Sequence, residues 1–182
     1  MTIVVHAAGN DKIGVGHLSR TRSLVAAFLA ADQNVSVIYE GNKQLVAHYR
    51  LPGASYHIVA DRTQALASRA ELVRNSTDFK PVLITDLLDL NKAAAKLARE
   101  QGFNTLVHLN DSGIPDYCPD IWVNGDAFAE VDKRLDHNVL QLLGAPYHIV
   151  QAAVLNNRRT KPWHKAVVKR VLVTMGGGIL RA

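Results

Sequence analysis

The residues best suited to chemistry lie in one glycine-rich loop, Gly14-Val15-Gly16-His17-Leu-Ser-Arg20. Glycines let the backbone approach a ligand closely, and the free amides at the start of a helix attract an anion. The positive end of a helix dipole disfavours a charged imidazole, so His17 is predicted to be a neutral ring that can accept a proton near pH 7. Arg20 lies one helical turn further on and can reach the same opening. The pattern favours a substrate-binding turn with a general base. The alternative is that the glycines only form a turn and His17 is a capping or surface group.

Two carboxylates are predicted at the same edge of the fold. Asp86 follows the apolar run 81–85, and Asp111 follows the apolar run 104–109. If both runs are parallel strands, their carboxyl ends meet at the edge where ligands bind, beside His17. Each carboxylate could then orient a histidine, bind sugar hydroxyls or activate water. Both aspartates also suit ordinary turns and caps, which is the alternative interpretation.

A second glycine cluster lies near the end of the chain. Gly176-Gly177-Gly178 directly follows the apolar run 171–175. Successive amides after a strand can cradle a phosphate, so Gly176 and Gly177 are candidate substrate-binding residues.

The sequence predicts neither a metal nor a cofactor. The eight histidines show no metal-binding spacing, and Cys118 is the only cysteine, so an internal disulfide and a thiolate cluster are excluded. A dinucleotide is the alternative, because Gly14-x-Gly16-x-x-Ser19 approximates the nucleotide-binding fingerprint and Glu40 follows about 20 residues later. Ser19 replaces the third glycine of that fingerprint, and the loop is longer than the tight dinucleotide turn.

The elements that must position these residues alternate along the chain. Short apolar runs are followed by segments of helical periodicity, which is typical of a parallel sheet with crossover helices. We therefore predict an α/β fold, a Rossmann-like open parallel sheet. The expected strands are 2–8, 34–40, 55–60, 81–85, 104–109, 121–124 and 171–175; the expected helices lie over 18–29 and 43–50, from 63, and from a cap at Asp89 or Asn91 to Gly102.

Length and charge suggest how the chain is divided. The 182 residues, 48% apolar and 20% charged, allow one full domain and the beginning of another. We predict a Rossmann-like domain over 1–156, a basic linker over 157–170, and the first strand and glycine loop of a truncated second domain over 171–182. All 16 acidic residues lie before residue 137, so the net charge of +5 comes from the tail. Trp163 is the only aromatic residue in the linker, so nucleic-acid binding is not expected.

Membrane and export signals are also missing from the sequence. The longest apolar run, 24–31, falls well short of the ~20 residues that span a bilayer. The first residues carry no basic group before their apolar run, unlike a secretory signal. With a single cysteine, the expected location is the cytoplasm.

Taken together and in order, several motifs resemble one family of enzymes. They are Gly14-x-Gly16-His17-x-x-Arg20, Asp86 after an apolar strand, Asn110-Asp111 after the next, 142–147 (Leu-Leu-Gly-Ala-Pro-Tyr), and 171–175 followed by Gly176-Gly177. The chain resembles the nucleotide-sugar hydrolase of pseudaminic acid biosynthesis and the related spore-coat polysaccharide proteins, which share the two-domain GT-B glycosyltransferase fold.

The resemblance implies both a reaction and a division of labour. It implies cleavage or transfer of a UDP-linked acetamido sugar without a metal, with His17 as the base for the attacking water or acceptor hydroxyl. The amides around Gly14 and Gly16 would face the sugar or diphosphate, and a second domain would supply most uridine contacts. Two features depart from the family. Asp86-Leu87-Leu88 replaces the usual Asp-His-Tyr, and after Gly178 the family continues for a whole nucleotide-binding domain.

The expected function is therefore the N-terminal half of a nucleotide-sugar hydrolase or glycosyltransferase, inactive alone and needing a nucleotide-binding domain in trans. Two alternatives remain: a small NAD-binding protein that uses Glu40, and a non-catalytic remnant or partner module.

Overall fold

The computed structural model describes residues 1–10, 13–77, 80–111 and 116–158. Its centre is a seven-stranded sheet in which every neighbouring pair of strands is parallel, in the order β3-β2-β1-β4-β5-β6-β7. The predicted Rossmann-like open sheet is therefore confirmed. The strands are β1 (Ile3–Gly9), β2 (Val35–Gly41), β3 (Ser55–Val59), β4 (Val82–Asp86), β5 (Thr105–Leu109), β6 (Ile121–Asn124) and β7 (Leu140–Leu143).

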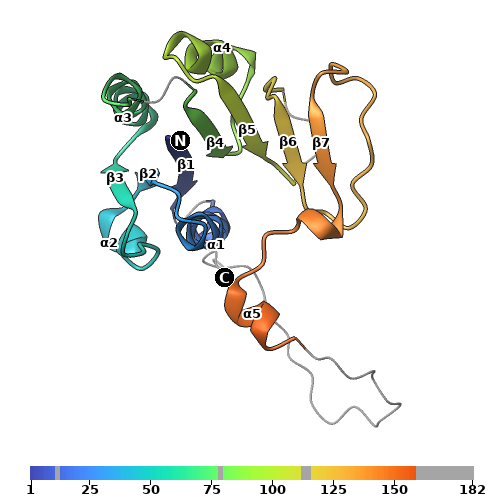
Figure 1. Cartoon of the computed structure of the whole chain (residues 1–182), viewed down its shortest axis with the longest axis horizontal. Helices are drawn as coiled ribbons and strands as arrows, with labels where there is room; N and C mark the ends of the chain where they lie inside the picture. The colour runs from blue at the N-terminus through green and yellow to red at the C-terminus, as the bar shows by residue number, and fades with distance from the viewer. Residues whose placement is uncertain (11–12, 78–79, 112–115, 159–182) are drawn as a thin grey trace, which may run out of the picture.

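Helices cover both faces of the sheet (Figure 1). Leu18 and Val25 of α1 join one apolar core, whereas Ala65 of α3 and Ala98 of α4 join the core on the other face. The helices are α1 (Gly16–Ala30), α2 (Lys43–Ala47), α3 (Arg62–Arg74), α4 (Lys92–Glu100), the 3-10 turn η1 (Ala145–Tyr147) and α5 (Ala152–Asn156). The three layers are those expected when apolar strands alternate with amphipathic helices.

The helix ends follow local chemistry. Asn91, rather than Asp89, caps α4, because its side chain accepts a hydrogen bond from the amide of Ala94. Gly102 follows α4 with φ +100°, so the predicted glycine stop is confirmed.

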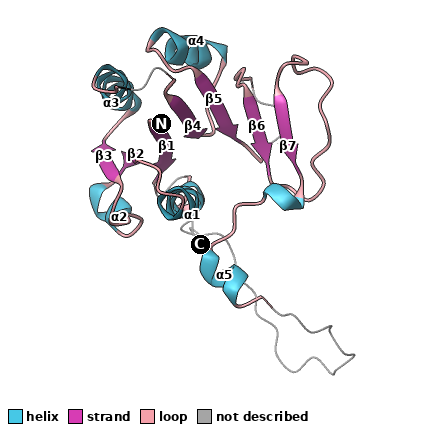
Figure 2. Cartoon of the chain, viewed as in Figure 1, coloured by secondary structure: helices cyan, strands magenta, loops and turns pink. Residues whose placement is uncertain are grey.

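The crossover helices end with β5. Between β5 and β7 the described residues form no helix, and Figure 2 shows loops connecting these strands. The strand β7 is not among the strands predicted from the sequence. The predicted strand 171–175 and the segment 159–170 lie outside the described residues.

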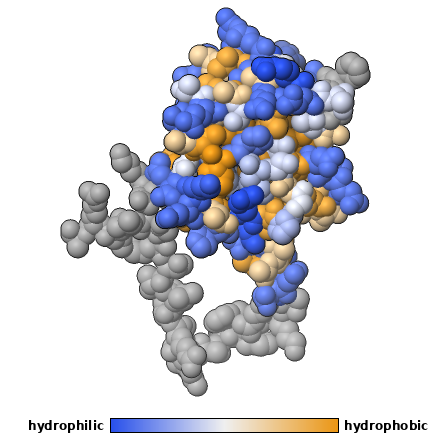
Figure 3. Space-filling view, turned by 90° about the vertical axis from the view of Figure 1, so that its left-hand side faces the viewer, coloured by the Kyte–Doolittle hydropathy of each residue, from blue (hydrophilic) through white to orange (hydrophobic). Residues whose placement is uncertain are grey.

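The outer surface is mixed in character. On the side of the molecule shown in Figure 3, hydrophilic residues predominate and hydrophobic ones gather in patches between them. Among the described residues, no helix is long and apolar enough to cross a membrane.

Close packing at the end of β1 sets the position of α1. A Cβ atom at Gly9 would lie 2.4 Å from Cγ of Leu18, so the helix can lie this close only because residue 9 has no side chain. The loop then turns at Gly14, which has φ +77° and whose amide donates to the carbonyl of Asn10 over 2.8 Å. As a result, α1 begins directly above the carboxyl end of the sheet.

Candidate functional site

The candidate site lies where the strand order reverses. The chain runs outward from β1 through β2 to β3, then returns to place β4 on the other side of β1. In open α/β sheets, the crevice beyond the carboxyl ends of the strands at such a switch point is the usual ligand site. The His17 loop follows β1, Asp86 ends β4, and Asp111 follows β5.

Four residues predicted from the sequence come together here. Nδ1 of His17 lies 2.6 Å from Oδ1 of Asp86. Arg20 donates to both oxygens of Asp86, from Nε to Oδ2 over 2.9 Å and from Nη2 to Oδ1 over 2.5 Å. Its Nη1 also donates to Oδ2 of Asp111. The structure thus joins a histidine, an arginine and two aspartates from three segments of the chain.

The carboxylate of Asp86 is the centre of this cluster. Its side chain is fully buried, whereas those of His17 and Arg20 are 16% and 18% exposed. Burial alone would raise the pKa of Asp86, but hydrogen bonds from Arg20 and His17 outweigh burial and hold the pKa below its ordinary value. Asp86 is therefore a carboxylate at neutral pH, and it gives His17 a fixed anionic neighbour.

This contact determines the tautomer of His17. Nδ1 lies 2.6 Å from Asp86 but 3.5 Å from Nη2 of Arg20, and a single ring nitrogen cannot donate to one and accept from the other. The shorter, charge-assisted contact is the stronger, so Nδ1 carries the proton and donates to Asp86. Among the described residues Nε2 has no hydrogen-bond partner, so its lone pair is available as a base.

The three residues of the predicted substrate-binding turn, Gly14 to Gly16, differ in their surroundings. The amide of Gly14 bonds to Asn10 and is not free to bind an anion, and the side chain of Val15 packs against the apolar core. Gly16 lines a cavity beside His17. Gly14 therefore shapes the turn, Gly16 keeps its predicted place at the site, and Gly176 and Gly177 lie outside the described residues.

His17 lies between two cavities. One, of about 580 Å³, is lined by Arg20 and Asp111 and by the segment before α5, where Gln151 donates to the hydroxyl of Ser19 over 2.8 Å. The other, of about 300 Å³, lies on the far side of His17; it is lined by Ala8, Asn10, Ile13, Glu40, Arg62, Asp86, Leu87, Leu88 and Asp89. His17 is therefore next to space for a ligand in both cavities.

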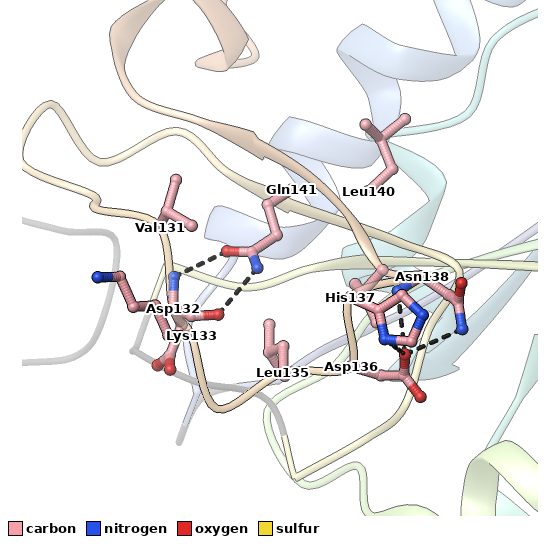
Figure 4. A pocket seen from close by; sticks show the side chains of 10 residues that line it. Val131, Asp132, Lys133, Leu135, Asp136, His137, Asn138, Leu140 and Gln141 are labelled. Atoms are coloured by element: carbon pink, nitrogen blue, oxygen red, sulfur yellow. Dashed lines mark hydrogen bonds and ion pairs between the residues drawn. The ribbon is translucent and has the colours of Figure 1, made fainter.

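Another cavity lies away from this cluster. It has a volume of about 620 Å³ and is lined by residues between 131 and 141, from the connection between β6 and β7 and the start of β7 (Figure 4). Its polar groups bond to each other, as in the two hydrogen bonds between Gln141 and the backbone of Asp132. The one histidine there, His137, is 90% exposed beside Asp136, which is itself 64% exposed, whereas His17 is held against a fully buried carboxylate.

Sequence reasoning missed a second polar cluster behind the site. The side chain of His6 is fully buried in the sheet. It also contacts Arg69 of α3 and Glu40 of β2, and Glu40 in turn binds Arg62. A signal was present in the sequence: Arg69 lies three residues after Leu66 and four before Val73, on the apolar face of its helix.

This cluster also bears on the dinucleotide alternative. A ribose-binding carboxylate at the end of β2 must be free to accept hydroxyl hydrogen bonds. Oε1 of Glu40 already faces both His6 and Arg62. The carboxylate is therefore partly committed to protein partners.

Metal ligation finds no support in the described residues, which contain no group of three or more His, Cys, Asp or Glu side chains placed to hold an ion. Cys118 is free and exposed. No protein-family model matches the chain, and no curated protein matches it significantly.

Proposed function

We propose that this chain supplies the general base of a nucleotide-sugar hydrolase or glycosyltransferase that acts on a UDP-linked amino or acetamido sugar. The observation that carries the proposal is the contact between Nδ1 of His17 and the buried carboxylate of Asp86, 2.6 Å apart. An imidazole held in this way keeps its second nitrogen free and directed away from the carboxylate, as a general base requires. The resemblance of the sequence motifs supports the choice of a UDP-linked sugar.

The proposed reaction begins with water or an acceptor hydroxyl in contact with Nε2 of His17. Its oxygen attacks the anomeric carbon, its proton moves to Nε2, and the bond from the anomeric carbon to the UDP oxygen breaks, with the electron pair leaving on UDP. The imidazolium that forms is stabilised by Asp86. Arg20 binds both oxygens of Asp86 and so fixes the direction from which the carboxylate meets the ring.

The nucleotide part of the substrate is assigned to a second domain. The resemblance implies that this domain contacts uridine, and Gly176 and Gly177 would belong to its phosphate loop. The described residues then supply the base and the surface that meets the sugar. This division is the reason to test His17 by a method that does not require turnover.

Carbethoxylation by diethyl pyrocarbonate, followed by mass spectrometry, provides that test. The free Nε2 of His17 should react, and UDP-N-acetylglucosamine should slow its modification. His137, 90% exposed and far from the site in sequence, is the internal control and should react equally with and without the ligand. Where UDP release is measurable, His17→Gln should reduce it by roughly 10²–10⁴-fold, the usual contribution of a general base.

Two results would overturn the proposal. One is modification of His17 that saturating UDP-N-acetylglucosamine does not slow, which is also the outcome expected of a non-catalytic module. The other is UDP release that His17→Gln leaves unchanged.

Binding of NAD is the second candidate, favoured by the strand order. An order that reverses at β1 is also that of dinucleotide-binding domains. Saturable NADH binding that is lost in Glu40→Ala would support it. The presence of Ser19 at the third glycine position of the dinucleotide fingerprint argues for the nucleotide-sugar proposal instead.

A further inference from the structure

The smaller cavity beside His17 has a wall built from charged residues of three segments. Arg62, at the start of α3, donates from Nε to Oε1 of Glu40 and from Nη2 to Oδ1 of Asp89, the latter over 2.8 Å. Within the described part of the chain, Nη1 of Arg62 and Oε2 of Glu40 have no hydrogen-bond partner. The wall therefore offers an unused donor and an unused acceptor side by side, in a cavity that His17 also lines.

A chain of buried groups holds this wall from behind. Arg69 is 1% exposed, and its Nη2 donates to Nδ1 of His6. Burial lowers the pKa of His6 to about 4, so the ring is neutral at pH 7 and its single proton lies on Nε2. That nitrogen lies 2.6 Å from Oε1 of Glu40, in a short contact that is poorly aligned as a hydrogen bond. Glu40 is thus held between His6 on the core side and Arg62 on the cavity side.

Stability alone does not account for this arrangement. A partly exposed ion pair such as Arg62 with Asp89 contributes little to folding, whereas burying the guanidinium of Arg69 costs much more. Nε of Arg69 also has no hydrogen-bond partner among the described residues. The contacts of Arg69 with His6 and of His6 with Glu40 do fix the orientation of Glu40, and Glu40 in turn fixes the orientation of Arg62.

The chemistry of the cavity selects a class of ligand. Each sugar hydroxyl both donates and accepts hydrogen bonds, so a fixed guanidinium beside a carboxylate suits a pair of neighbouring hydroxyls. Leu87 and Leu88 add an apolar surface suited to the C–H groups of a ring. A diphosphate would instead meet the carboxylates of Glu40, Asp86 and Asp89, opposed by Arg62 alone among the arginines of the lining.

We propose that Arg62, together with Glu40 and Asp89, binds the hydroxyls of a neutral sugar ring in this cavity, and that Arg69 and His6 are positioning residues for that contact. This inference rests on the proposed function and extends it, because it assigns the sugar to the side of His17 that faces β2 and β4. The diphosphate then lies outside this cavity.

Free N-acetylglucosamine, titrated into the full chain and followed by NMR, tests the sugar contact without turnover. Arg62→Gln should weaken binding by roughly tenfold, as expected for loss of one charge-assisted hydrogen bond. Arg74→Gln is the matched control, because Arg74 is exposed at the other end of the same helix, and its binding should be unchanged. Equal affinity in Arg62→Gln and the native chain, or no binding by the native chain, would refute the sugar site.

Pyrophosphate distinguishes a sugar site from an anion site. If pyrophosphate displaces N-acetylglucosamine and itself binds more weakly to Arg62→Gln, the cavity binds an anion and the inference is wrong. The outcome is also separable from that of the proposed function. Protection of His17 by the UDP-sugar with no effect of Arg62→Gln leaves the base in place and removes only the sugar site. Sugar binding through Arg62 without protection of His17 would support the sugar site and refute the proposed role of His17 as the base.

The positioning role has its own test at His6. A glutamine can still accept from Arg69 and donate to Glu40, so His6→Gln should keep sugar affinity within about twofold. His6→Leu can do neither and should lose roughly tenfold, even at temperatures where circular dichroism shows the variant to be folded. Equal sugar affinity in the folded leucine and glutamine variants would show that His6 only fills space.

Discussion

Replacing Asp86 by asparagine should show how much the buried carboxylate of the site contributes to stability, compared with the exposed carboxylate of Asp111. The substitution keeps the size of the side chain and removes its charge. Arg20, 18% exposed, would then keep only its ion pair with Asp111. Removing one partner of a buried ion pair costs about 3–5 kcal/mol. Because Arg20 keeps its ion pair with Asp111, we expect the free energy of unfolding to fall by about 3 kcal/mol, near the lower limit of that range.

The matched control is Asp111→Asn, which makes the same chemical change on the same arginine. Asp111 is 45% exposed, so its ion pair with Arg20 should contribute about 0–1 kcal/mol. Urea denaturation at pH 7.5 gives both values. Long-range ¹H–¹⁵N spectra of the histidine rings give the second readout: the neutral His17 ring should carry its proton on Nδ1 in the native chain and in Asp111→Asn, and lose that preference in Asp86→Asn. Equal destabilisation by the two variants, or a native ring protonated on Nε2, would refute the assignment of Asp86.

Two further predictions concern packing and pH. Gly9→Ala should destabilise the chain by about 1–3 kcal/mol in urea denaturation, because its Cβ would lie 2.4 Å from Cγ of Leu18. The control is Gly16→Ala, whose Cβ meets no atom within 4 Å and which should change stability little. Similar losses of stability in both variants would contradict this packing. Burial lowers the pKa of His6 and of His108 from 6.5 to about 4, so the unfolded chain binds more protons between these values, and stability should be complete above pH 6.5 and fall as the pH drops toward 4. Each group contributes roughly 3 kcal/mol to that loss, and His108→Gln should flatten the pH dependence measured by thermal unfolding.

The residues proposed to carry the reaction could be predicted because one rule of parallel sheets places them. Asp86 and Asp111 each follow an apolar run, and the carboxyl ends of such strands meet at one edge of the sheet. The rule needs only the order of elements along the chain. It does not say which atoms touch. The helix dipole predicts a neutral His17, but only the structure places Asp86 against Nδ1, the contact from which the position of the proton is inferred.

The cluster behind the cavity could not be predicted because it depends on strand register. His6 lies opposite Ile38 on β2 and Thr85 on β4, so its ring enters the core one row below Glu40. A shift of one residue between β1 and β2 would turn His6 or Glu40 to the opposite face and break the contact, and composition and periodicity do not fix register at that precision. Arg69 could be recognised as a charge on an apolar helix face, yet its partner could not. The sequence thus points to the proposed base, whereas the groups proposed to orient the sugar can be recognised only once the strands are paired.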